Sequence, residues 1–221
     1  MTSAPEWVKG TELEAAFTLA DEAHTGKTRK DKDEPYINHL INVAEMVRTY
    51  GGSIDQIRAA FLHDTIEDTD VTEERLSNEI SPGVARIVVV CTDTEPGDVP
   101  PAGRDKLEWR ERKARYHLRL ADKAENDPAL LVSLCDKIDN SEDSARDARA
   151  LGPARFWEKF NAGGTCQYWN YTTLLGLYRE KLTDPRAAQA VNRLARALDE
   201  LFAGDIPQCT STTHSHDGEK N

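Results

Sequence analysis

Four potential metal ligands are spread over three segments that the sequence predicts as helices. They are His39, the adjacent pair His63 and Asp64, and Asp136. Asp136 lies in the apolar run 131–138, where an unpaired carboxylate is costly to bury and calls for a cation or a hydrogen-bond partner. A divalent ion would satisfy Asp64 and Asp136 together, with the two histidines as neutral nitrogen ligands. This donor set favours a borderline to hard metal, Mn²⁺ or Fe²⁺, and is also compatible with Zn²⁺.

Two further carboxylates follow this pair by four residues. Glu67 and Asp68 are therefore expected on the same helical stripes as His63 and Asp64, near the same pocket. Four ionisable groups within six residues have the pattern of an active-site rim. The alternative for these two residues is a solvated acidic helix end, and for His39 alone it is an ordinary hydrogen-bonded histidine.

The segments that must position these residues all have the pattern of helices. Capping residues and apolar repeats predict an all-α bundle of roughly ten helices joined mostly by short loops. Only segment 81–91, which is rich in valine, could also be a strand, and the Pro and Gly content of 93–103 indicates a loop. The predicted helices cover 11–26, 35–51, a stretch from 53 past 64, a stretch from 72, 81–91, 104–125, a stretch from 127, 153–160, 164–182 and 184–202.

Length and composition limit the class of protein. The chain has 221 residues and a formal charge of −11, which suits one domain over 1–204 followed by a disordered tail over 205–221. The longest apolar stretch, 84–91, is much shorter than the roughly 20 residues of a membrane-spanning helix, so we expect no membrane association. The N-terminus lacks a secretion signal and the four cysteines are widely spaced. We therefore expect a cytoplasmic protein without a disulfide framework.

Charge is distributed unevenly along the chain. The acidic balance makes a nucleic-acid polymer an improbable partner, because such binding needs many phosphate contacts from Lys and Arg. Two local basic segments remain, 27–32 with a charge of +3 and 104–119 with a charge of +4. They are suited to a small phosphorylated ligand, although the second could equally be a solvated helix with internal ion pairs. The sequence leaves the oligomeric state open.

Three motifs, in order, resemble the hydrolase domain of the RelA/SpoT alarmone enzymes, a group of HD-domain phosphohydrolases. The first is AHTGKTRK at 23–30 with EPYINH at 34–39, the second is FLHDTIEDT at 61–69, and the third is LCDKIDN at 134–140. Downstream, FWEKFNAG at 156–163 and YWNY at 168–171 resemble a stand-alone bacterial branch of that family. The resemblance implies an HD-domain helical bundle of the small alarmone hydrolase type.

The resemblance also implies an activity and a set of site residues. The expected reaction is metal-dependent hydrolysis of the 3′-pyrophosphate of (p)ppGpp to GDP or GTP and pyrophosphate, with Mn²⁺ as the expected ion. The metal ligands would be His39, His63, Asp64 and Asp136, and Glu67 and Asp68 would act on the water. The substrate-binding candidates are Arg29 and Lys30 beside the base, Asn140 at the nucleotide, Lys113 at the pyrophosphate by approximate position, and Tyr168, for which aromatic core packing is the alternative.

Three departures from the family pattern leave alternatives open. Asp139 stands where the family usually has His, Leu40 replaces a Pro, and the link 29–34 is one residue longer. The same site could therefore act on another nucleotide, namely (p)ppApp, NADPH or a nucleoside monophosphate. A non-catalytic nucleotide-sensing protein of the same fold is the alternative from another functional class.

Overall fold

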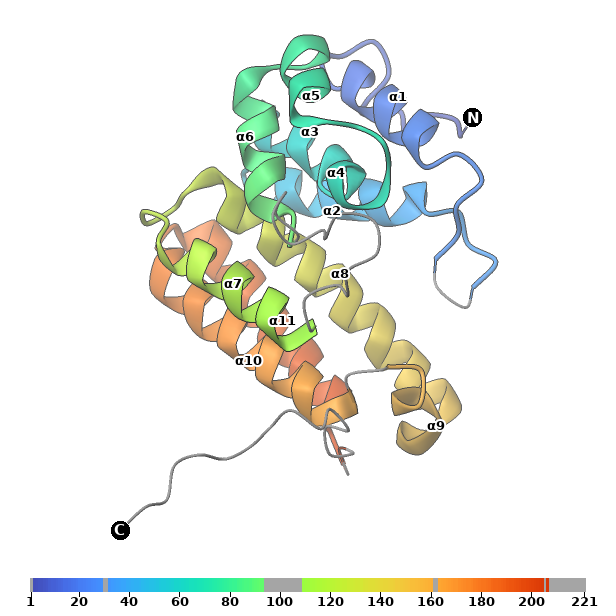
Figure 1. The fold of residues 1–221 in the computed structure, drawn as a ribbon, viewed down its shortest axis with the longest axis vertical. Helices are drawn as coiled ribbons and strands as arrows, with labels where there is room; N and C mark the ends of the chain where they lie inside the picture. Colours follow the sequence, from blue (N-terminus) through green and yellow to red (C-terminus); the bar gives the residue numbers. More distant parts are fainter. Residues whose placement is uncertain (1, 30–31, 94–108, 161–162, 205, 207–221) are drawn as a thin grey trace, which may run out of the picture.

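The computed structural model describes residues 2–29, 32–93, 109–160, 163–204 and 206, which form eleven α-helices (Figure 1). No strand occurs in these ranges, so the all-α prediction of roughly ten helices is confirmed, and the valine-rich segment 81–91 is helical. The helices are α1 (Glu14–Ala23), α2 (Ile37–Thr49), α3 (Ile54–Leu62), α4 (Thr65–Asp68), α5 (Glu73–Glu79), α6 (Pro82–Cys91), α7 (Trp109–Ala121), α8 (Pro128–Leu151), α9 (Pro153–Trp157), α10 (Gly163–Lys181) and α11 (Pro185–Leu201).

Side-chain caps begin several of these helices at the predicted residues. The Ser53 hydroxyl accepts a hydrogen bond from the Gln56 N–H at 3.3 Å, and the Gln56 side chain accepts one from the Ser53 N–H at 2.8 Å. This reciprocal capping box satisfies two backbone donors that the first turn leaves unpaired. Single side-chain caps start four more helices, at Thr72, Ser81, Asp127 and Asp184.

The long helix α8 lies between two groups of helices. In Figure 1, α1 to α6 gather at one end of the molecule, α7, α10 and α11 lie beside one another at the other, and α8 runs diagonally between them. Its 24 residues extend over roughly 36 Å at about 1.5 Å per residue, and it contacts α2, α3, α6, α10 and α11. Buried apolar side chains from α1 to α11 form one cluster around it. A polar residue on α8 can therefore reach either group of helices.

The chain between α3 and α4 differs from the expected continuous helix. Helix α3 ends at Leu62, and a separate turn of helix, α4, begins at Thr65. Side chains occupy carbonyls at this break: Thr65 Oγ1 donates to the Leu62 oxygen at 2.7 Å, and His63 Nδ1 lies 2.8 Å from the Ala60 oxygen. Such side-chain bonds compete with the helical backbone ladder. His63 and Asp64, expected near the end of the helix that begins at Ser53, therefore lie between α3 and α4, and the acidic pair Glu67 and Asp68 lies on α4.

The structure also bears on the expectations about disulfides, membrane spanning and domain boundaries. Cys91 and Cys135 are free thiols, whereas Cys166 is disulfide-bonded, although the wide spacing of the cysteines predicts no disulfide framework. Among the described residues, none of the helices combines the length and apolar character needed to cross a membrane. The predicted tail lies outside the described residues except for Ile206, and so does the predicted loop 93–103 except for Asp93. The proposed domain boundaries stay predictions.

Two glycines provide a stability test with opposite signs. Gly51 ends α2 with a φ of 79°, a region that residues with a Cβ rarely adopt, whereas Gly176 lies inside α10 with open space around it. We expect Gly51→Ala to lower the free energy of unfolding by about 1 kcal/mol and Gly176→Ala to raise it by about 0.5–1 kcal/mol. Urea titration followed by circular dichroism would measure both. Equal effects of the two substitutions would contradict the assigned backbone conformations.

Candidate active site

The predicted metal ligands come together where α2, α3 and α8 meet. His39 lies on α2, His63 directly follows α3 and Asp136 lies on α8, and one ligand atom from each falls within 4.8 Å of the others. The Nε2 atoms of His39 and His63 are 3.4 Å and 3.6 Å from Asp136 Oδ1. Asp64 Oδ2 lies 3.5 Å from the first of these nitrogens and 3.1 Å from the second. The helix break described above lets adjacent His63 and Asp64 approach the same point.

Hydrogen bonds determine which nitrogen of each histidine is available. His63 Nδ1 faces the carbonyl of Ala60, which can only accept, so Nδ1 carries a proton, and in the neutral imidazole Nε2 is the nitrogen with the lone pair. His63 Nε2 is buried and has no hydrogen-bond partner among the described residues. In the same way, His39 Nδ1 lies 2.7 Å from a carboxylate oxygen of Asp139. Both Nε2 atoms therefore face the carboxylates as potential ligands.

The electrostatics of this cluster favour a cation at its centre. Burial alone would lower the pKa of His39, but Asp136, Asp139 and Asp64 outweigh it and raise that pKa to about 9. Burial would likewise lower the pKa of His63, but the carboxylates of Asp64 and Asp136 outweigh it and raise that pKa well above its usual value. The two histidines would thus hold protons at neutral pH unless another cation replaced them. A divalent ion fits this donor set of two imidazole nitrogens and carboxylate oxygens.

The two carboxylates are held in place by neighbouring side chains. The Tyr36 hydroxyl donates to Asp64 Oδ2 at 2.6 Å, and Lys137 Nζ donates to Asp136 Oδ2 at 2.5 Å. Asn140 donates to the other oxygen of Asp136. Partners of this kind orient metal ligands and tune them. The sequence interpretation missed Tyr36 and Lys137, although both lie inside the motifs that revealed the ligands.

Asp139, which stands where the family usually has His, contacts the ring of the metal-ligand candidate His39. One of its oxygens contacts His39 Nδ1, and the other accepts from Asn42 at 3.2 Å. Asp139 lies three residues after Asp136 on α8, so both carboxylates project from one face of the helix. Its carboxylate thereby fixes the ring orientation and the tautomer of His39, as a carboxylate partner commonly does for a metal-binding histidine.

Glu67 belongs to a second group of buried charges. Its carboxylate accepts from the backbone N–H of Asp93 at 3.3 Å, and the side chain of Asp93 forms an ion pair with Lys113. Burial and the neighbouring Asp93 raise the pKa of Glu67 to about 7. Lys113 thus belongs to this second group of charges, where it is paired with Asp93. The sequence interpretation missed Asp93, because only tertiary contact between the end of α6 and α7 reveals its position.

A pocket of about 550 Å³ opens beside α4. Its lining includes Glu67 and Asp68, together with the cationic side chains of Lys27 and Arg75. Burial and the nearby Asp64 raise the pKa of Asp68, and Lys27 opposes that shift. Lys27 also donates a hydrogen bond to the backbone carbonyl of Asp68, which ties the predicted basic segment to α4.

A second pocket, of about 270 Å³, lies on the α8 side and brings two predicted substrate contacts together. Arg29 Nη2 donates to Asn140 Oδ1 at 3.1 Å and to Asp143 Oδ2 at 3.3 Å. Both Arg29 and Asn140 line this pocket, together with the rings of Phe156 and Phe160. Lys30, the neighbour of Arg29 in the prediction, lies outside the described residues.

Tyr168 lies apart from these pockets. It is on α10, 48% exposed, and packs edge to face against Phe202 with ring centroids 5.2 Å apart. It is not among the described residues that line the two pockets beside the cluster. Its contact with a nucleotide stays a prediction.

Comparison with known proteins agrees with this geometry. Residues 16–154 match the family model of the HD domain. The chain belongs to the HD domain family. It is 37% identical over 131 residues to guanosine-3′,5′-bis(diphosphate) 3′-pyrophosphohydrolase MESH1 of Danio rerio, covering 58% of this chain and 66% of that protein. It is also 32% identical over 130 residues to guanosine-3′,5′-bis(diphosphate) 3′-pyrophosphohydrolase of Aquifex aeolicus. That match covers 58% of this chain but only 17% of the Aquifex protein.

Solved structures show the same HD fold. A protein from Listeria monocytogenes EGD-e, lmo0812, aligns with a TM-score of 0.64 at 23% identity, over 75% of this HD-domain chain and 99% of that chain. A metazoan orthologue of SpoT that hydrolyses ppGpp aligns with a TM-score of 0.62 at 24% identity, over 88% and 97% of the two chains. At these identities the likeness establishes the fold alone.

Removing the Asp139 carboxylate tests its role in orienting His39. We expect Asp139→Ala to weaken Mn²⁺ binding by about 10- to 100-fold, because His39 loses the partner that fixes its tautomer. Asp139→Asn should weaken binding less, since its amide oxygen can still accept from Nδ1–H. Isothermal titration of metal-free protein with Mn²⁺ would measure this. The exposed Asp199→Asn on α11 is the matched control, and an Asp139→Ala protein with unchanged affinity would refute the role.

Metal binding at this cluster should depend on pH. Because the pKa values of His39 and His63 are raised, both imidazoles hold protons near pH 7 and must lose them to coordinate a metal ion. Mn²⁺ affinity should therefore rise with pH through the neutral range and at least as far as the pKa of His39, about 9, with release of about two protons per ion near pH 7. Titrations in buffers of different ionisation enthalpy would count these protons. Affinity that is independent of pH would contradict the predicted protonation.

Proposed function

We propose that this chain is a metal-dependent hydrolase that removes the 3′-pyrophosphate of (p)ppGpp, giving GDP or GTP and pyrophosphate. The observation that carries the proposal is the buried convergence of His39, His63 and Asp136, with Asp64 beside them, in an HD-domain fold. Relatives 36–37% identical to this chain bear the name of that activity. The chain spans 17% and 66% of the first two relatives, so the assignment of activity remains our inference.

We further propose that His39, His63, Asp64 and Asp136 are the metal ligands and that Mn²⁺ is the ion. The donor set of two imidazoles and two carboxylates suits a borderline to hard divalent cation, and Fe²⁺ or Zn²⁺ would also match it. When bound, such an ion supplies Lewis-acid activation of water and of a phosphoryl oxygen. Tyr36 and Lys137 hold the two carboxylates toward the centre by their hydrogen bonds.

Glu67 is suited to accept the proton of the attacking water. A general base works best when its pKa is near the working pH, and burial beside Asp93 raises the pKa of Glu67 to about 7. Asp68 is the next residue on α4 and faces the same pocket, where its carboxylate can orient the water. The water oxygen then bonds to the phosphorus as the bond from that phosphorus to the ribose 3′ oxygen breaks. The 3′ oxygen takes up a proton as a hydroxyl of GDP or GTP, and pyrophosphate is released.

The two pockets beside the cluster can hold the two parts of a nucleotide. The α4 pocket has Lys27 and Arg75 in its lining, so cationic side chains are available to a pyrophosphate group. The α8 pocket combines Arg29, Asn140 and two phenylalanine rings, which suits a planar base. The second pocket is joined to the metal cluster through Asn140, which donates to Asp136, and the first includes Asp68, whose carboxyl feels the charge of Asp64. Direct contact of Lys113, Lys30 and Tyr168 with substrate stays a prediction.

Product analysis with Mn²⁺ tests the function. We expect the full-length protein to release pyrophosphate from ppGpp, and His63→Ala and the near-isosteric Asp64→Asn to abolish release while circular dichroism shows that the fold is retained. Glu67→Gln should lower kcat by about 10²- to 10⁴-fold, because it removes the base without removing a metal ligand. The exposed Arg155→Gln on α9 is the control that should leave turnover unchanged.

The same assay separates the competing functions. Parallel reactions with (p)ppApp, NADPH and nucleoside monophosphates would show whether the site prefers another nucleotide. Binding of ppGpp without turnover of any of these compounds would favour a nucleotide sensor. Absence of pyrophosphate release from guanosine or adenosine alarmones under metal-replete conditions would overturn the proposed reaction.

A further inference from the structure

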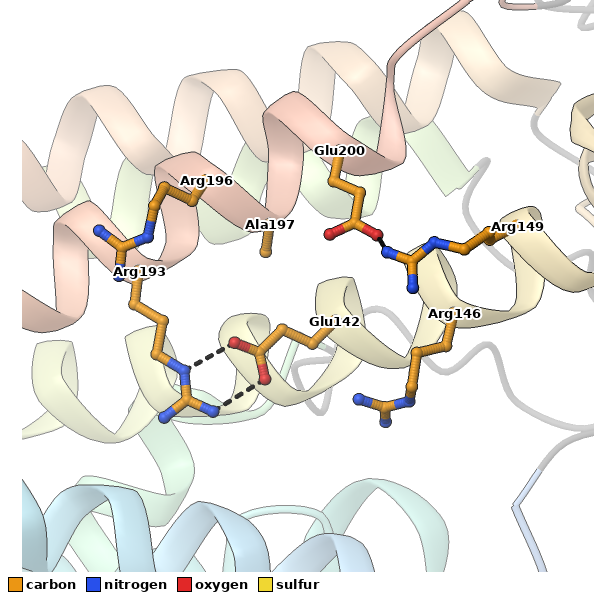
Figure 2. A pocket seen from close by; sticks show the side chains of 7 residues that line it. All are labelled: Glu142, Arg146, Arg149, Arg193, Arg196, Ala197 and Glu200. Carbon is orange, nitrogen blue, oxygen red and sulfur yellow. Dashed lines mark hydrogen bonds and ion pairs between the residues drawn. The ribbon is translucent and has the colours of Figure 1, made fainter.

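An arginine-rich groove of about 460 Å³ lies between α8 and α11, apart from the pockets described above (Figure 2). Two arginines come from each helix, and Figure 2 shows the side chains of α8 and α11 facing one another across the gap. The charged residues of this arginine groove are Arg146, Arg149 and Glu142 from α8, and Arg193, Arg196 and Glu200 from α11.

The arginine groove has an excess of positive charge in an acidic protein. Four guanidinium groups against two carboxylates leave a local charge of +2, whereas the whole chain has −11. Arg193 is the strongly held member, because its Nε and Nη2 atoms bind both oxygens of Glu142 at 2.6 Å and 2.8 Å. This bidentate pair joins α11 to α8 and forms one wall of the groove.

The other three arginines are available to a ligand. The guanidinium of Arg196 has no ion pair or hydrogen bond to another residue in the part of the chain that the structure describes. The side chains of Arg146 and Arg149 are 60% and 69% exposed, and each is paired with one carboxylate, Asp143 and Glu200 respectively. Exposed pairs of this kind contribute little to stability, so an anion can compete for the guanidinium groups.

We propose that the arginine groove binds an anion with two or more adjacent phosphate groups, at a site separate from the metal cluster. The planar guanidinium group binds phosphate oxygens in a bidentate manner. A single phosphate can be held by Arg196 alone, whereas linked phosphates can engage Arg196 together with the exposed Arg146 and Arg149, and they gain from the proximity of these guanidinium groups. The groove volume is within the range of small-molecule sites.

Arg146 connects this site to the proposed substrate pocket. Its partner Asp143 also accepts from Lys32 at 2.6 Å and from Arg29 at 3.3 Å, and Asp143 lines the α8 pocket. A ligand that draws Arg146 away leaves the Asp143 carboxylate to Arg29 and Lys32, which holds Arg29 more tightly. Occupation of the groove should therefore raise the KM for the nucleotide substrate. This second expectation rests on the proposed function, whereas the binding itself does not.

Titration with inorganic pyrophosphate tests the binding. The titrated protein is the 221-residue chain with His63→Ala, in metal-free buffer that contains EDTA, so that no metal ion at the cluster binds pyrophosphate while the groove is intact. If this variant does not fold, the wild-type chain is titrated in the same buffer. We expect saturable binding of pyrophosphate that includes one site per chain at the groove, and the affinity of that site should fall at least tenfold in the Arg149→Gln/Arg196→Gln double variant. Both positions are exposed, so the fold should persist. Arg155→Gln, outside the groove, should bind as the parent does.

The outcomes decide the proposal whether or not the chain hydrolyses alarmones. Saturable binding that depends on Arg149 and Arg196, and that is at least tenfold weaker for orthophosphate, supports it. No binding of pyrophosphate, equal binding by the double variant, or equal affinity for orthophosphate overturns it. In an active enzyme, a rise in KM with added pyrophosphate that disappears in the double variant would establish the connection through Arg146.

Discussion

Two histidines and two carboxylates share a buried space in which their charges must balance. His39, His63 and Asp136 are almost fully buried, and Asp64 is close to both imidazoles. Without a cation, two nitrogen lone pairs would face carboxylate oxygens at 3.1–3.6 Å in a medium of low dielectric constant, which is unfavourable. The raised pKa values of the histidines express this demand for positive charge. The neighbouring helices can be understood as the scaffold that holds these groups together.

Helix α8 does most of that positioning. Asp139 and Asn140 lie three and four residues after Asp136, and Asp143 lies three residues after Asn140. One face of the helix therefore provides a metal-ligand candidate, the partner of His39 and the contacts of Arg29. On another side of the same helix, Glu142, Arg146 and Arg149 face α11. Arg146 reaches back to Asp143 and so links the two sides. A single rigid helix can thus couple the proposed catalytic site to the proposed second binding site, whose arginines on α8 follow Asp136 by about three to four turns.

Much of the fold was predictable because its information is local. Caps at Ser53, Thr72 and Ser81 begin helices where the sequence places them, and Gly51 ends α2 with a positive φ. The break at His63 and Asp64 was not predictable, because both residues remain close to helical backbone angles and the interruption arises from side chains that bind nearby carbonyls.

The sequence by itself determined the helical class and the candidate ligands, since helix periodicity and the His, His-Asp and Asp motifs are visible in the order of residues. Only the tertiary structure decided which groups surround those ligands. Asp139 was visible as a departure from a family pattern, but its bond to His39, 100 positions away, depends on the crossing of α2 and α8. Asp93 beside Glu67, and Arg193 across from Glu142, likewise join residues far apart in the chain. Their charges interact through space, and the linear sequence does not encode distance between elements until packing of the apolar core sets it.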